Sequence, residues 1–130
     1  SHPGGCYSYA IESGGKKVIY STDTELNEAD FNRSPENERY FGDADALIID
    51  AQYTLGEAIE KQYWGHSSFS LAADFATSWR IKRLILFHHE PTYSDKKIES
   101  ILKSAAWYLS HMEDRGVSVI LAREGLEIEV

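Results

Sequence analysis

Residues 83–91 read Arg-Leu-Ile-Leu-Phe-His-His-Glu-Pro, a short apolar run that ends in two histidines. Apolar residues at consecutive positions are typical of strands that are covered on both faces of a sheet. Pro91 ends this strand, and the proline keeps Glu90 before it extended. We therefore expect His88 and His89 at the C-terminal end of a buried strand.

The neighbouring segments predict an α/β fold around this strand. Ala46-Leu47-Ile48-Ile49-Asp50 is a second apolar run, and residues 6–12 and 17–22 predict a hairpin around Ser13-Gly14-Gly15-Lys16. Residues 117–122 and 126–130 predict two more strands. The main helices are expected from Ser67 or Ser68 to Arg80 and from Ser94 to Arg115, with a shorter one at 55–61. The sum is one domain, 1–130, with about six strands and two main helices on one face.

Composition excludes several classes of protein. The 130 residues are 42% hydrophobic and 12% aromatic, which is enough for a core, and no apolar run could span a bilayer. The single cysteine, Cys6, rules out an internal disulfide framework and fits a reducing compartment, so we expect a cytoplasmic protein. Thirteen Lys and Arg against 21 Asp and Glu give a net charge of −8, which argues against a broad nucleic-acid surface.

Polar side chains that can bind metal gather at the ends of the predicted strands. Asp23 ends the second strand, and His2 precedes the first, while His66 precedes the first main helix. Ligands and metals collect at such strand ends in α/β folds, and imidazole with carboxylate suits zinc, manganese or iron. His88 and His89 would point to opposite faces of a continuing strand, so one of them is the candidate ligand. His111 lies inside the long helix and is expected to be structural or exposed to solvent.

Four motifs in order resemble the second half of a metallo-β-lactamase-fold hydrolase. They are His-Pro-Gly-Gly, Val-Ile-Tyr-Ser-Thr-Asp-Thr-Glu, Gly-His-Ser-Ser and Arg-Leu-Ile-Leu-Phe-His-His-Glu-Pro. The branch they resemble includes ribonuclease Z and cyclic-phosphate phosphodiesterases. This resemblance implies half of an αββα sandwich. It also implies two divalent metal ions, zinc or manganese, and a small phosphodiester as substrate.

The resemblance also implies roles for four residues. His2 and His88 resemble metal ligands, and Asp23 resembles the carboxylate that bridges two metals. His66 resembles the histidine that assists proton transfer near the leaving group. His89-Glu90 departs from the ribonuclease Z sequence, which argues against tRNA processing.

The family's first motif, His-x-His-x-Asp-His, does not occur in this chain. The sequence begins at Ser1 and its only methionine is Met112, so we interpret it as the C-terminal half of a larger hydrolase, inactive alone. The expected partner is the missing N-terminal half. A second copy is also expected, paired through the uncovered sheet face as a homodimer, unless residues 24–42 fold over that face. The competing hypothesis is a non-catalytic interaction or regulatory module without a metal site.

Overall fold

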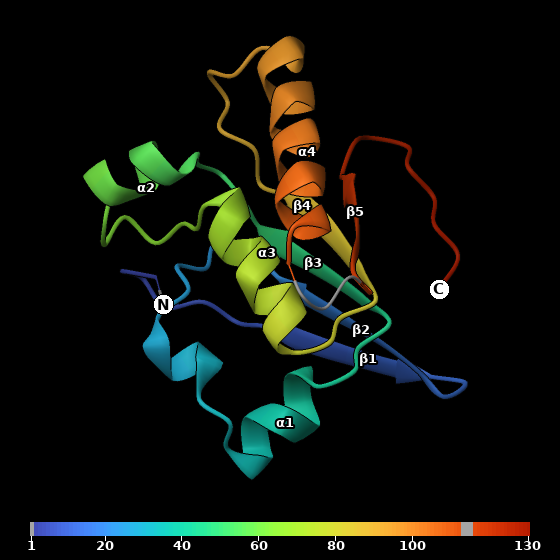
Figure 1. The fold of residues 1–130 in the computed structure, drawn as a ribbon. Helices are drawn as coiled ribbons and strands as arrows, with labels where there is room; N and C mark the ends of the chain where they lie inside the picture. The colour runs from blue at the N-terminus through green and yellow to red at the C-terminus, as the bar shows by residue number, and fades with distance from the viewer. Residues whose placement is uncertain (1, 113–115) are drawn as a thin grey trace.

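The computed structural model describes residues 2–112 and 116–130, and their strands form one five-stranded sheet (Figure 1). Its strands lie in sequence order. They are β1 (Tyr9–Ser13), β2 (Lys16–Ser21), β3 (Ala46–Asp50), β4 (Arg83–Phe87) and β5 (Ser118–Leu121). β1 and β2 pair antiparallel as a hairpin, and each pair from β2 to β5 is parallel. The C-terminal ends of β2, β3 and β4 therefore meet at one edge of the sheet.

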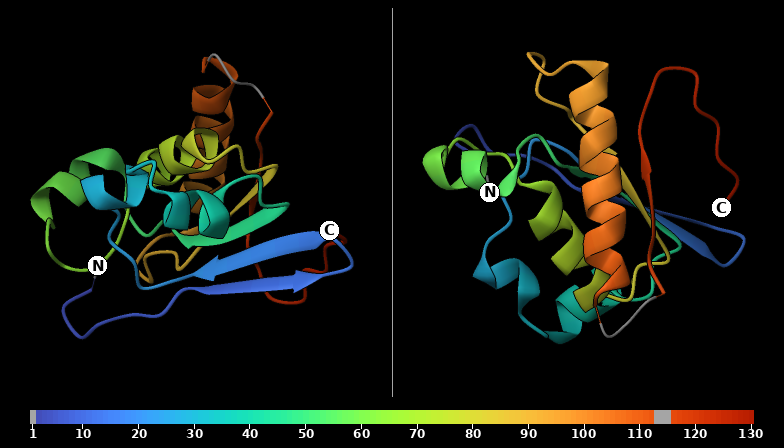
Figure 2. Two further views of the ribbon diagram at one scale, coloured as in Figure 1. Left: turned by 90° about the horizontal axis from the view of Figure 1, so that it is seen from below. Right: turned by 45° about the horizontal axis from the view of Figure 1, so that its top comes forward.

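The helices are α1 (Pro35–Phe41), α2 (Leu55–Glu60), α3 (Phe69–Ser78) and α4 (Asp95–Ser110), with a 3₁₀ turn η1 (Glu28–Phe31). Ser68 and Ser94 cap α3 and α4 as the sequence predicts, because each side chain accepts a hydrogen bond from a backbone N–H of the first turn. Both main helices cover the same face of the sheet (Figures 1 and 2). No helix of the described residues is long and apolar enough to cross a membrane.

The core lies between this sheet face and the two main helices. Pairing places Ile19, Leu47, Leu84 and Val119 in one row across β2 to β5. The first three are fully buried against Ala72, Ala73, Phe75, Ala76, Ile101 and Ala105 of the helices. Small residues on α3 let the helix approach the sheet closely.

Residues 24–42 pack against α3, so the alternative in which they cover the second sheet face is wrong. The Phe31 and Phe41 rings meet the Phe75 ring edge-on at 5.5 and 5.0 Å. Trp79 Nε1 donates to the carbonyl of Asp30 at 3.1 Å. The few large apolar groups of this segment are used on the helix side of the molecule.

The second sheet face carries apolar side chains away from the helices. Register places Tyr20, Ile48, Ile85 and Ile120 in one row, opposite in direction to the core row. Tyr9 and Ile11 extend this face on β1 and are 57% and 59% exposed. Ile85 in this row is buried, so the apolar groups that are more than half exposed lie on β1. We call the surface from Tyr9 to Ile120 the open face. Apolar residues at consecutive positions of its strands are the reason that the sequence predicts cover on both sides.

Several predicted boundaries differ from the structure. β1 spans residues 9–13 where 6–12 was expected, and α3 ends at Ser78 where Arg80 was expected. Residues 126–130 form no strand, because the chain turns at Gly125 and leaves the sheet after β5, and Arg83 Nη1 instead donates to the Glu129 carbonyl at 2.8 Å. α4 ends at Ser110, where the predicted helix continues to Arg115; residues 113–115 lie outside the described residues. The predicted α/β class, with both main helices on one face, is confirmed, with five strands among the described residues where about six were expected.

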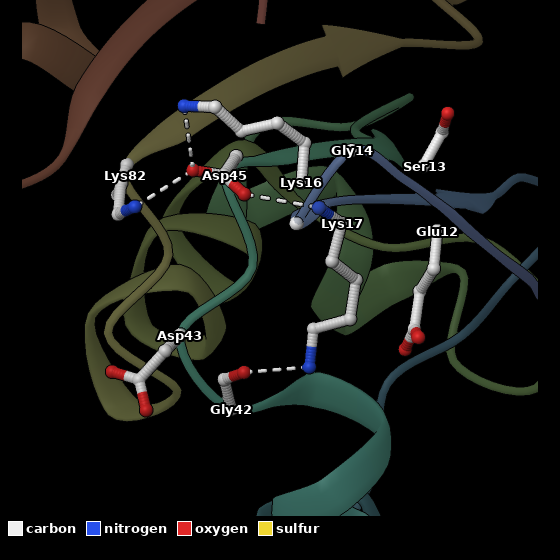
Figure 3. A pocket seen from close by; sticks show the side chains of 10 residues that line it. Glu12, Ser13, Gly14, Lys16, Lys17, Gly42, Asp43, Asp45 and Lys82 are labelled. Carbon is white, nitrogen blue, oxygen red and sulfur yellow. Dashed lines mark hydrogen bonds and ion pairs between the residues drawn. The ribbon is translucent and has the colours of Figure 1, made fainter.

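A pocket at the opposite end of the sheet is lined by paired charges (Figure 3). Lys16 and Lys82 both place their ammonium groups beside one oxygen of Asp45, at 3.5 and 2.7 Å. Lys17 donates from its amide to Asp45 at 2.9 Å and from its ammonium to the Gly42 carbonyl at 2.7 Å. These contacts tie the β1–β2 hairpin to the starts of β3 and β4, which is a structural role.

Candidate active site

The edge where β2, β3 and β4 end brings Asp23, Asp50 and His88 together. Asp50 is the last residue of β3, and His88 follows β4 directly. Asp23 and His88 both have left-handed backbones, with φ of 51° and 58°. Such values are uncommon outside glycine and turn each side chain out of its strand direction. The structure thereby points residues from two strands at one place: His88 Nε2 lies 3.3 Å from Asp23 Oδ1.

Asp50 forms the buried floor of this site. Its side chain is fully buried and accepts hydrogen bonds from the backbone N–H groups of Thr24, Gln52 and Ser67 at 3.2–3.3 Å. It also lies 2.7 Å from His66 Nδ1. Burial raises the pKa of Asp50, while the hydrogen bonds from His66 and the backbone oppose that rise. A buried carboxylate with this many donors fixes the position of whatever it contacts.

His66 sits above Asp50 with one ring nitrogen engaged. Because Nδ1 faces Asp50, the other nitrogen, Nε2, is the one left for a substrate or an ion. The His66 ring stacks on the His88 ring at 4.8 Å with an angle of 15°, and the Tyr53 ring lies edge-on at 6.0 Å. The imidazole is therefore held on several sides, as a group that transfers a proton at a fixed position must be.

His88 completes the centre of the site. Its Nδ1 is buried, lies 3.8 Å from Asp50 Oδ2, and has no hydrogen-bond partner among the described residues. An imidazole nitrogen left without a partner in a polar site is suited to an ion or a water molecule.

His2 approaches from the N-terminus through a gap that Gly65 leaves. The His2 and His66 rings are 5.7 Å apart, edge-on. A Cβ on Gly65 would stand 2.4 Å from His2 Cδ2 and 2.8 Å from Pro3 Cδ, and the φ of Gly65 is +94°. Glycine is required here for both reasons, close approach and backbone conformation.

Gly65→Ala is expected to displace His2 from the site and to weaken metal binding by about 10–100-fold, the usual effect of disturbing the support of a ligand. Zinc titration followed by competition with a chromophoric chelator measures the change. Gly56→Ala is the matched control, since Gly56 lies in α2 with open space around it. Equal zinc affinity in the two variants would contradict the position we give His2.

Comparison with known proteins now identifies the family. Residues 1–89 match the family model described as the beta-lactamase superfamily domain. The chain belongs to this superfamily. It is also similar to proteins named Ribonuclease Z: 31% identical over 86 residues in Bradyrhizobium diazoefficiens, covering 66% of this chain and 26% of the relative. The Ribonuclease Z of Nitrosopumilus maritimus is 30% identical over 116 residues, which cover 89% of this chain and 33% of that relative. The chain thus spans about a quarter to a third of the length of these relatives.

Solved structures show the same fold. The metallo-beta-lactamase fold protein YhfI from Bacillus subtilis superposes with a TM-score of 0.73 at 22% identity, covering 96% of this chain and 44% of that protein. The short form of human tRNase Z superposes with a TM-score of 0.56 at 26% identity, and the match covers 66% of this chain and 32% of that protein. The resemblance that the sequence motifs suggest is therefore confirmed at the level of superfamily and fold.

The side chains at this edge fit the divalent metal that relatives in the superfamily imply. Ligand atoms of His2, Asp23 and His66 lie within 4.8 Å of one another, and so do those of Asp50, His66 and His88. Imidazole and carboxylate donors of this kind suit zinc and manganese. The buried Nδ1 of His88, which has no hydrogen-bond partner in the described part of the chain, is the clearest sign that an ion fits.

The structure brings all four predicted site residues together: His2, Asp23, His66 and His88. His89 points elsewhere; it lies beside Ala122, both of its ring nitrogens are buried, and burial lowers its pKa. His111 directly follows α4, where it is exposed and its ring packs on Trp107, in agreement with the expectation that it is structural or exposed to solvent. Asp50 is the site residue that the sequence interpretation missed. Its signal was a carboxylate ending an otherwise apolar strand, which is costly unless it has partners.

Proposed function

We propose that this chain is the C-terminal part of a two-metal phosphodiesterase. The observation that supports it is the convergence of His2, Asp23 and His88 with the Asp50–His66 pair at one sheet edge. Superfamily membership and the Ribonuclease Z relatives agree with a hydrolase of this type.

In this proposal His2, Asp23 and His88 hold the metal, and bound ions supply positive charge and an activated water. His66 acts on the other side of the phosphorus. A water that has lost one proton to solvent would form a new P–O bond through its oxygen as the P–O bond to the leaving group breaks, and the proton on His66 Nε2 passes to the leaving oxygen. His66 then regains a proton from solvent. Asp50 keeps Nδ1 of His66 engaged, so that Nε2 stays directed at the leaving group.

The experiment that tests this uses the protein expressed from its full reading frame, with whatever residues precede Ser1. Hydrolysis of bis(p-nitrophenyl) phosphate is measured with zinc or manganese and again after chelation with EDTA. Metal-dependent release of nitrophenol supports the proposal. A protein that carries metal but leaves the diester intact would contradict it and favour the non-catalytic module.

The 130-residue chain alone is expected to bind zinc or manganese weakly, with far fewer than two ions per chain at micromolar metal. His2, Asp23 and His88 give three ligands for two ions, and each ion normally needs three or four protein ligands. Metal analysis of the dialysed chain measures this. Two ions retained per chain would show that Asp50 and His66 also ligate.

The open face is the proposed contact for a second sheet. In solution we expect the isolated chain to form a homodimer through this face, since it leaves Tyr9 and Ile11 more than half exposed on an apolar surface. The N-terminal part of the same protein would take that place in the intact enzyme. Sedimentation equilibrium at micromolar concentration measures the mass, with Ile11→Lys as the variant that weakens the contact. A wild-type species of 14.7 kDa would contradict the dimer.

We also propose a small phosphodiester as the substrate, and a cytoplasmic location remains a prediction. The net charge of −8 disfavours a large polyanion such as folded RNA.

A further inference from the structure

A pocket with His66 in its wall lies between α2 and the first turns of α3 (Figure 1). Its volume is about 290 Å³, which is at the lower end of the range of ligand pockets. His66 is also part of the candidate metal edge, where its ring stacks on that of His88 and its Nδ1 is held by Asp50 at 2.7 Å. The imidazole therefore borders both the candidate metal edge and this pocket.

The wall of the pocket is largely aliphatic. Five aliphatic side chains line it: Leu26, Leu55, Ala58, Ile59 and Leu71. Leu55 and Ile59 are four residues apart in α2, which places them on one face of the helix. They are 57% and 70% exposed. Large aliphatic groups that are exposed together beside a candidate active site indicate a surface that another molecule covers.

Polar side chains at this pocket bind other parts of the chain. Ser67 Oγ donates to the Thr24 carbonyl at 2.6 Å and accepts from the Leu26 N–H at 3.0 Å. Asp74 accepts a hydrogen bond from the Tyr108 hydroxyl at 2.7 Å. A molecule that enters the pocket therefore need not supply hydrogen-bonding groups to these side chains.

The side chains of the wall argue against two kinds of ligand. No lysine or arginine of the described chain lines the pocket, whereas Glu25 and Asp74 bring carboxylates to it, so a phosphate would be repelled. Phenylalanine, tyrosine and tryptophan are also absent from the described residues of the wall. The His66 imidazole already stacks on His88, so a flat aromatic ligand would find no free ring to stack on. A neutral aliphatic group is the ligand that fits this wall.

The leaving group is the part of the substrate nearest His66 in the proposed mechanism. The proton of His66 Nε2 passes to the leaving oxygen, so the carbon chain on that oxygen begins beside the imidazole. The aliphatic pocket that shares His66 is then the space into which this chain extends.

We propose that this pocket binds the alkyl group of the leaving alcohol. This rests on the proposed function and specifies its substrate class: a phosphodiester of a short, unbranched aliphatic alcohol. Leu55, Ile59 and Leu71 contact the alkyl chain, and the small side chain of Ala58 leaves room for it. The pocket selects an alkyl group over an aryl group and selects among alcohols by chain length.

Binding of free alcohols to the metal-free 130-residue chain tests the pocket without turnover. The probes are n-propanol, n-butanol and n-hexanol. The readout is the NMR shift of the Leu71 methyl groups and of the His66 ring protons, which belong to residues that no variant changes. The dissociation constant is expected to fall by up to about fourfold for each added methylene, the usual gain from burying one.

Two variants alter the wall of the pocket. Ala58→Phe, which fills the space, is expected to weaken n-hexanol binding by about tenfold or more. Ile59→Ser is expected to weaken it by about 3–10-fold, and because Ile59 is exposed this variant tests the pocket even if Ala58→Phe does not fold. Ala106→Phe and Ile128→Ser are the matched controls at exposed positions outside the pocket, and neither should change the affinity.

Three results would overturn the inference. They are equal affinity for the three alcohols, unchanged n-hexanol affinity in Ile59→Ser, and a saturable shift of Leu71 that leaves the His66 signals unchanged. The two proposals fail separately. Alcohol binding beside Leu71 and His66 without metal-dependent hydrolysis contradicts the phosphodiesterase and leaves the alkyl pocket standing, whereas hydrolysis without alcohol binding contradicts only the pocket.

Discussion

His66→Ala in the full-length protein is expected to lower the kcat for phosphodiester hydrolysis by about 10²–10⁴-fold while the metal content stays the same. The magnitude is that of removing a positioned proton donor. His66 Nδ1 is occupied by Asp50 at 2.7 Å, so the side chain is already fixed by the protein without an ion. Steady-state kinetics with metal analysis of the same samples measures both quantities.

Two further variants make this result specific. His88→Ala is expected to lose metal first, because the Nδ1 of His88 is buried and unpartnered among the described residues and its Nε2 faces Asp23. His111→Ala is the control, since its ring packs on Trp107 outside the site. If His66→Ala lost its metal, the histidine would be a ligand and the assigned proton transfer would be wrong.

Trp79→Ala is expected to destabilise the chain by about 3–5 kcal/mol, the usual cost of removing a buried tryptophan. Trp79 is fully buried and contacts Phe41 and Phe75, and its indole N–H donates to the Asp30 carbonyl. The variant would therefore leave a cavity where the indole was. It would also lose the hydrogen bond that links residues 24–42 to Trp79 at the end of α3. Urea unfolding followed by circular dichroism measures the change.

The control for this prediction is Trp107→Ala, which changes the same residue type at a position that is 64% exposed. Exposed substitutions of this kind usually change stability by less than about 0.5 kcal/mol. Similar unfolding midpoints for the two variants would mean that residues 24–42 are not part of the cooperative core.

Much of the fold could be predicted because burial leaves a direct trace in the sequence. The runs at 46–49 and 84–87 are apolar at every position, a pattern typical of strands that are covered on both faces. Residues 126–130 alternate between apolar and acidic side chains, a pattern that also predicts a strand, yet they form none, since alternation does not say whether a partner strand is within reach. The placement of residues 24–42 also could not be predicted, because it depends on tertiary packing. Phe31 and Phe41 of this segment pack on α3.

The site could be predicted in its members but only partly in its geometry. Each of the four predicted residues lies just before or just after a predicted strand or helix, and the sequence alone shows this. They are His2, Asp23, His66 and His88. Asp50 was missed because a carboxylate that ends a buried strand looks like the start of a loop. Its role depends on donors from residues 24, 52 and 67, which are distant in sequence and meet only in the folded chain. The left-handed backbone of His88, which separates it from His89, leaves no mark in the sequence at all.

The left-handed conformations of Asp23 and His88 have a consequence for how this site can persist. A non-glycine residue in that region costs about 1–3 kcal/mol, whereas glycine adopts it freely. Replacing His88 by glycine would therefore relieve strain while it removed the site, so stability and chemistry oppose each other at this position. In a lineage under selection for folding alone, these two residues would be among the first to drift to glycine or asparagine. Histidine retained at position 88 in distant copies of this chain would thus be a sign that the chemistry is still in use.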